Sequence, residues 1–280
     1  MDGTIIRDYE FPVELVPMQA VWNEQTIDVP ANVQRAVVRT DTNQILGTHG
    51  SKYSIKTHGT VVDEVMSAVS NANLSSDYDL KIDTFDNGAQ MRGKVSFNDL
   101  VMEPAKDDYV RFDVGFWNSY DGSWSIQITA EGLRLWCLNG CTTADSVSKT
   151  FKKHTAGVSI AQEASKLQTA LDMFFNQKST WQNWMNTRCD THSVTCLFEE
   201  TLAAYPSKYE ARINNKQMEV LLRKWNDEAS IMGSNLWAAY NTATWWASHP
   251  DAAKPQNVER QRSNQVAAML RSPSWKLLAK

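Results

Sequence analysis

Two alternating polar and apolar runs joined by a tight turn constrain the fold of this chain most strongly. Residues 80–85 and 89–97 both alternate, and Asn87-Gly88 lies between them. This dipeptide between alternating runs is a strong hairpin signal, because both residues tolerate the positive φ of a two-residue turn. The same pattern over residues 109–130 predicts a second hairpin. The middle of the chain is therefore expected to be an antiparallel sheet.

In the regions on either side of these hairpins, apolar residues recur at different spacings, which predict strands and a helix before the hairpins and helices after them. Residues 35–56 contain short β-rich runs, and Thr60 is expected to cap a helix whose apolar face includes Val61, Val65 and Val69. After the second hairpin, a cap-rich stretch at 142–146 leads into a predicted basic helix. Further helices are expected at Ile160–Phe175, Ser179–Thr187, Val194–Ala204, Asn215–Gly233 and Leu236–Ser248, with a last one starting at Asn257.

These elements predict an α+β fold. Its order is ββα, then an antiparallel β-meander and a helix, followed by a Trp-rich helical region. We expect an extended N-terminal arm at 1–31, an α+β sheet domain at 32–155 and a helical C-terminal region at 156–280. The arm contains three prolines and no sustained periodicity, so at most one short extended piece is expected in it.

Composition excludes several classes of protein. The 280 residues carry a net charge of −4, so no protein-wide basic field attracts nucleic acid or an anionic membrane. Residues 1–110 hold 17 acids and 9 bases, whereas residues 111–280 hold 15 acids and 19 bases. The longest apolar runs are far too short to span a bilayer, and the first ten residues do not resemble a signal peptide. A cytoplasmic protein with four reduced, buried cysteines is expected.

Motifs for catalysis are missing from the sequence. The five histidines are scattered without metal-ligand spacing, and no glycine-rich phosphate loop is present. Cys137 lies in an apolar run typical of an inert core thiol. The sequence therefore predicts no enzyme activity, no cofactor and no metal.

Basic and aromatic residues interleave on the predicted strands, which is typical of a surface that binds single strands. Arg92 and Lys94 are two residues apart and so share one face of their strand. The other interpretation is the solvated face of an ordinary sheet. The candidate DNA-binding residues are Lys52, Lys56, Lys81, Arg92, Lys94, Arg111, Trp117, Tyr120, Lys149, Lys152 and Lys153.

Eleven tryptophans are an unusual number for this length. Six of them lie between residues 181 and 246 at helical spacings, which suits a helical core or a subunit contact. Because subunit interfaces are enriched in Trp, we expect a homo-oligomer, with residues 1–31 lying across an adjacent subunit.

Three separated motifs carry a resemblance to a known family. They are Phe85–Phe97, Phe116–Ser123 and Leu133–Thr142, and Gly47–Ile55 resembles the opening strand motif. The chain thus resembles an uncharacterised family of phage and plasmid proteins, a domain of unknown function. Its element order is also similar to the strand-annealing recombinases of the Rad fifty-two type. That similarity implies a curved sheet beside a basic groove in a ring.

The leading hypothesis is a phage protein that binds single-stranded DNA and promotes annealing or homologous recombination without ATP. Its expected partners are single-stranded DNA, further copies of itself, and possible phage or host replication and recombination proteins, in the cytoplasm of the infected cell. The alternative is an interaction factor that engages a host or defence protein through its Trp-rich helical region.

Overall fold

The computed structural model describes residues 8–134, 139–141, 148–152, 164–205 and 212–280. The α+β class is confirmed, since antiparallel sheets and helices are both present. The chain forms two compact units. Unit 1 comprises Met1–Phe97, Val114–Ala130 and Ser148–Thr169, and unit 2 comprises Asn98–Asp113, Glu131–Val147 and Ala170–Lys280. The domain boundaries after residues 31 and 155 stay a prediction.

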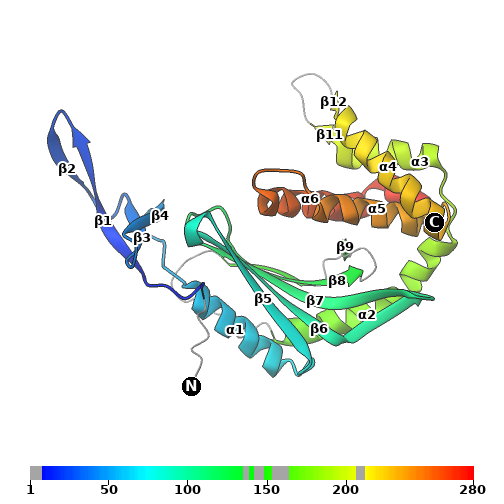
Figure 1. Ribbon diagram of the computed structural model, residues 1–280, viewed down its shortest axis with the longest axis horizontal. Coiled ribbons are helices and arrows are strands. Elements are labelled where there is room, and N and C mark those ends of the chain that lie inside the picture. The colour runs from blue at the N-terminus through cyan, green and yellow to red at the C-terminus, as the bar shows by residue number, and fades with distance from the viewer. Residues whose placement is uncertain (1–7, 135–138, 142–147, 153–163, 206–211) are drawn as a thin grey trace. The chain divides into compact units, whose positions relative to one another are not determined.

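A four-stranded antiparallel sheet begins unit 1, in the order β2-β1-β3-β4 (Figure 1). Its strands are β1 (Val13–Trp22), β2 (Gln25–Val29), β3 (Arg35–Arg39) and β4 (Gln44–His49). The prediction of at most one short extended piece was wrong, because Asn23 and Glu24 adopt positive φ (48° and 62°) and close a tight hairpin turn. One face of the sheet packs on a small core made of Phe11, Val37, Leu46, Ala89 and Tyr120.

Helix α1 (His58–Asn71) follows a segment with no regular structure. Its cap is Thr57 and not Thr60, since the Thr57 side chain accepts a hydrogen bond from the Thr60 N–H. The predicted apolar face is confirmed by the burial of Val61, Val65 and Val69. Residues 52–56 are not a strand, although their pattern alternates.

The larger sheet has the order β10-β8-β7-β6-β5, with β9 paired to β8. Both predicted hairpins are confirmed. The strands are β5 (Tyr78–Phe85), β6 (Gln90–Ala105), β7 (Asp108–Ser119), β8 (Ile126–Arg134), β9 (Asn139–Cys141) and β10 (Ser148–Lys152). The prediction of a basic helix at Lys149 was wrong, because Ser-Lys-Thr-Phe-Lys pairs with β8, with Lys149 opposite Thr129. Thr150 and Phe151 in this pentapeptide are of residue types enriched in strands.

At two glycines of this region, an added Cβ would overlap a neighbouring aromatic ring. Gly88 has φ 92° in the turn between β5 and β6, and a Cβ there would lie 2.6 Å from the Phe11 ring. At Gly93 in β6, a Cβ would lie 2.0 Å from a ring carbon of Phe116. Phe116 therefore crosses β6 at Gly93 and shares its face of the sheet.

Most of unit 2 is helical. Its helices are α2 (Ala164–Asn186, which begins within unit 1), α3 (Thr191–Phe198), α4 (Asn215–Met232), α5 (Leu236–Ser248), α6 (Pro255–Arg271) and α7 (Pro273–Leu278). The π-helix Glu199–Ala203 and the short strands β11 (Ala204–Tyr205) and β12 (Arg212–Ile213) lie between α3 and α4. The two helices expected within 160–187 are a single helix in the described part. The helix expected from Asn257 is α6, which begins two residues earlier at Pro255, and it is not the last, because α7 follows it.

Most of the described tryptophans of unit 2 lie in its core. Trp181, Trp225, Trp237 and Trp246 are at most 2% exposed, and Trp184 is also buried. Trp181 contacts Trp237, whose Nε1 donates to Asp108 Oδ2 at 3.0 Å. One chain thus accommodates these indoles, so the tryptophan count no longer supports an oligomer.

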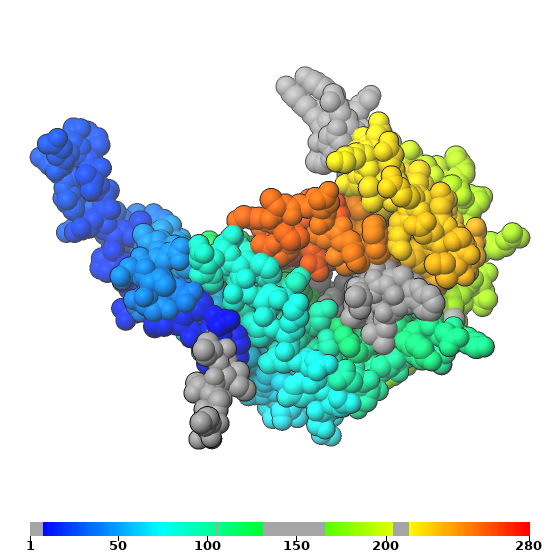
Figure 2. Space-filling model, in the orientation of Figure 1, coloured from blue at the N-terminus to red at the C-terminus, as the bar shows by residue number. Residues whose placement is uncertain are grey.

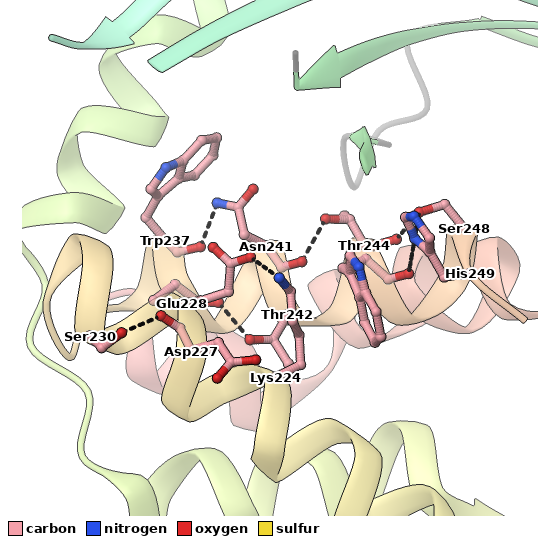
Figure 3. Close-up of polar contacts among 12 residues, drawn as sticks. Lys224, Asp227, Glu228, Ser230, Trp237, Asn241, Thr242, Thr244, Ser248 and His249 are labelled. Atoms are coloured by element: carbon pink, nitrogen blue, oxygen red, sulfur yellow. Dashed lines mark hydrogen bonds and ion pairs between the residues drawn. The ribbon is translucent and has the colours of Figure 1, made fainter. Parts of the chain in front are cut away.

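Helix α5 carries a buried polar stripe within this core (Figure 3). Asn241 Nδ2 donates to the Trp237 carbonyl at 2.8 Å, and Thr242 Oγ1 donates to the Ala238 carbonyl. On α4, Lys224 Nζ lies 2.8 Å from Glu228 Oε1, and Glu228 is 1% exposed. The ion pair offsets the cost of burying this carboxylate.

Candidate nucleic-acid interface

The β5–β6 register brings together three of the predicted cations. Lys81 lies opposite Lys94, and Asp83 lies opposite Arg92. Since alternate residues of a strand share a face, these four side chains start from one face of the hairpin. Gly93 and Phe116 belong to the other face. The structure thus groups Lys81, Arg92 and Lys94.

Carboxylates partly neutralise this group. Asp83 is shared between Lys81 at 3.5 Å and Arg92 at 3.3 Å, and Asp79 stands on the same face opposite Ser96. The Arg92 guanidinium also lies 5.8 Å from the centre of the Phe85 ring. Lys81 and Arg92 thus share one carboxylate, and the third cation, Lys94, stands opposite Lys81 on the same face.

Accessibility falls along this face from the edge of the sheet inward. The Lys81 side chain is 74% exposed and that of Arg92 28%, whereas Thr129 on β8 is 4% exposed. A phosphate backbone can therefore reach the β5–β6 edge more easily than β8.

The two predicted aromatics differ in their availability for stacking. Trp117 is half-buried, and its ring lies against Gly115 near Thr129. Tyr120 is fully buried, and its hydroxyl oxygen accepts the His58 N–H at 2.8 Å. Burial also raises the pKa of the Tyr120 hydroxyl. The prediction that Tyr120 stacks on a base was therefore wrong.

The environment of Tyr120 contains a buried histidine that sequence reasoning did not select. His58 is 0% exposed; its Nδ1 accepts from Asn118 Nδ2 at 2.9 Å, and its Nε2 donates to the Gly88 carbonyl at 2.9 Å. Donation at one ring nitrogen and acceptance at the other define the neutral imidazole. Among the described residues, no group of three His, Cys, Asp or Glu side chains is arranged to hold a metal ion. His58 therefore fixes the start of α1 against the sheet.

The remaining predicted cations lie elsewhere. Lys52 is exposed in a loop that lines a cavity of ≈ 350 Å³ with His49 and Tyr53. Lys56 contacts both carboxylate oxygens of Glu64, at 2.6 and 2.7 Å. No sequence pattern indicates this pair, because the two residues are eight positions apart.

Arg111 belongs to unit 2, where its Nε lies 2.9 Å from Oδ1 of the fully buried Asp113. Its charge is thereby compensated. Lys149 and Lys152 fall in β10, opposite Thr129 and Ile126. Their side chains and all of Lys153 lie outside the described residues.

A second cavity, of ≈ 520 Å³, lies near Phe11 and is lined by the carboxylates of Asp8, Glu10, Asp41 and Asp86. Arg39 also lines it, but its guanidinium binds Asp41 at 2.8 and 3.0 Å and lies 4.0 Å from the centre of the Phe11 ring. The Asp41 hydrogen bonds lower the pKa of that carboxyl. This acidic lining would repel phosphate.

Among its described residues, unit 2 holds two cation–aromatic contacts that sequence reasoning also did not select. Lys224 Nζ lies 5.1 Å from the Trp245 ring centre, and the Arg262 guanidinium lies 4.5 Å from that of Trp246. Arg262 also donates to the Trp246 carbonyl at 2.8 Å, and burial lowers its pKa. The i, i+4 spacing of Lys224 and Glu228 was the one visible signal for this cluster.

Comparison with known proteins gives a family and no activity. No curated protein matches the chain. Within the described part of the chain, no helix is both long and apolar enough to cross a bilayer. The family model described as a domain of unknown function (DUF932) matches residues 46–269. This match covers both the β5–β6 hairpin and most of the helical region, and it shows that the chain belongs to the DUF932 family.

Proposed function

We propose that this protein binds single-stranded DNA at the β5–β6 edge and promotes strand annealing without ATP. One observation carries the proposal: the register that sets Lys81 opposite Lys94 and beside Arg92. Such cations can follow a phosphate backbone, while the half-buried Trp117 offers an aromatic face to a base. The proposed setting is the cytoplasm of a phage-infected cell, with recombination or replication proteins as further partners.

The alternative proposal, a host-protein factor acting through its Trp-rich helices, has less support. Five of the six tryptophans between 181 and 246 are buried within unit 2, and only Trp245 is half-exposed. Buried indoles cannot contact a partner without unfolding part of that unit.

Fluorescence anisotropy with a labelled oligothymidylate tests the proposal through variants with opposite effects. Lys81→Ala is expected to weaken binding and Asp83→Asn to strengthen it, because Asp83 neutralises both Lys81 and Arg92. Lys178→Ala, an exposed lysine of α2, is the charge-matched control and should leave binding unchanged.

The salt dependence of binding gives a second readout. With about −0.7 per contact for single strands, three phosphate contacts predict that log K falls with log salt with a slope of about −2. Lys81→Ala should make this slope shallower by about one contact. Absence of binding at low salt, or weaker binding by Asp83→Asn, would refute the proposal.

A further inference from the structure

The β1–β2 hairpin extends beyond the rest of its sheet (Figure 1). The first half of β1 pairs with β3 up to Pro17, whereas Met18–Trp22 pairs with β2. Every residue from Gln19 to Asp28 is exposed (Figure 2, upper left). A two-stranded ribbon of this kind has little stability of its own in water.

The two faces of this ribbon differ in polarity. The register pairs Met18 with Val29 and Ala20 with Ile27, and these residues share a face with Trp22. On the opposite face, Gln19 Nε2 donates to Asp28 Oδ1 at 2.8 Å. The ribbon is therefore amphipathic although both faces are open to solvent.

The apolar face of the ribbon continues across β3 and β4. Glu14 and Ile45 both lie opposite Val38, which places Ile45 and Val38 on the face that also carries Val16. Trp22 is 66% exposed, Ile27 47% and Ile45 62%. We call the apolar side chains of this surface the outer apolar face, beside which Glu14 stands on the same side of the sheet; it consists of Val16, Met18, Ala20, Trp22, Ile27, Val29, Val38 and Ile45.

Charge indicates what can cover the outer apolar face. Residues 13–29 contain Glu14, Glu24 and Asp28 and no Lys, Arg or His. A nucleic acid would be repelled by this charge, and pairing two such hairpins would bring two acidic surfaces together, although only Glu14 stands on the apolar face itself. The occupant should therefore combine apolar and basic side chains.

A surface with this chemistry exists in unit 2 of the same chain. In α7, Leu277 is 70% exposed, and the exposed Lys276 and Lys280 lie on either side of it in the sequence. Residues 271–280 contain three cations and no carboxylate side chain. Trp275 anchors the helix in the core of unit 2, where it contacts Trp184.

We propose that the outer apolar face docks on α7 of a second copy of this chain. The contact is head-to-tail: each copy binds one neighbour through its outer apolar face and another neighbour through its α7. Repetition of this contact gives a ring or a filament. The inference rests on the homo-oligomer expected for an annealing protein, but it concerns protein contacts alone.

Mass photometry of the full-length chain without DNA tests the contact. Wild type is expected to form species larger than a monomer, and the double variant Trp22→Ser/Ile27→Ser should weaken self-association by at least about tenfold. Val21→Ser is the matched control, because Val21 is 76% exposed on the opposite face of the same ribbon. Circular dichroism should show an unchanged fold, since these side chains are outside the core.

Mixing two variants tests the head-to-tail geometry. Leu277→Ser keeps its hairpin intact but has an altered α7, and alone it should be monomeric. Mixed with Trp22→Ser/Ile27→Ser, which keeps α7 intact, it should form a dimer, because the mixture supplies one intact hairpin and one intact α7. A monomeric wild type at micromolar concentration, equal behaviour of Val21→Ser and the double variant, or no dimer on mixing would overturn the proposal. DNA binding by a monomeric wild type would overturn this contact and leave the proposed function standing.

Discussion

Gly93→Ala tests the packing that holds the candidate face in place. A Cβ at this position would lie 2.0, 2.2 and 2.6 Å from three ring carbons of Phe116, which is itself 0% exposed. Carbon atoms normally pack at about 3.5–4.0 Å, so the ring would have to move by about 1.5 Å within a filled core. Overpacking of this kind costs about 1–3 kcal/mol.

Urea unfolding followed by circular dichroism measures this cost. Gly50→Ala is the control, because its nearest neighbour would be the Val33 carbonyl at 3.7 Å. Phe116→Leu should relieve part of the cost of Gly93→Ala, so the two substitutions should be clearly non-additive. A Gly93→Ala variant as stable as wild type, or strict additivity, would show that Phe116 does not cross β6 at this point.

Two further predictions concern buried groups. Burial raises the pKa of the Cys189 thiol to about 11, so peptide mapping after brief iodoacetamide treatment at pH 8 should find Cys189 far less alkylated than the exposed Cys196; equal labelling would contradict its burial. Because the Tyr120 pKa is raised in the folded state, the free energy of unfolding should fall as the pH rises above about 10, where the unfolded tyrosine ionises. Tyr120→Phe should flatten this decline and cost about 1 kcal/mol at neutral pH through loss of the His58 N–H bond; an unchanged alkaline profile in urea titrations would refute the assignment.

The central hairpins were predictable because alternation and turn chemistry are local properties. Asn87-Gly88 needs no tertiary context to favour a turn, and the valines of α1 show a helical period. The β1–β2 turn was missed because its residues, Asn23 and Glu24, lack the glycine that usually reports positive φ.

The fate of individual side chains depended on contacts between distant segments. Tyr120 resembles a hairpin-tip aromatic in the sequence, but the buried His58 and Phe11 enclose it. The cysteines show the same limit: Cys189 is buried as expected, whereas Cys196 is exposed. The number of tryptophans likewise could not distinguish a subunit interface from the core of one chain. Trp181 of α2 contacts Trp237 of α5, and this contact is visible only in the folded structure.

Ultraviolet cross-linking to oligothymidylate, followed by peptide mapping, tests the central claim most directly. The account predicts cross-links within β5 and β6 and at Trp117, lost at high salt and reduced by Lys81→Ala. Cross-links confined to the acidic β1–β2 hairpin or to the helices of unit 2, with none on the larger sheet, would contradict it.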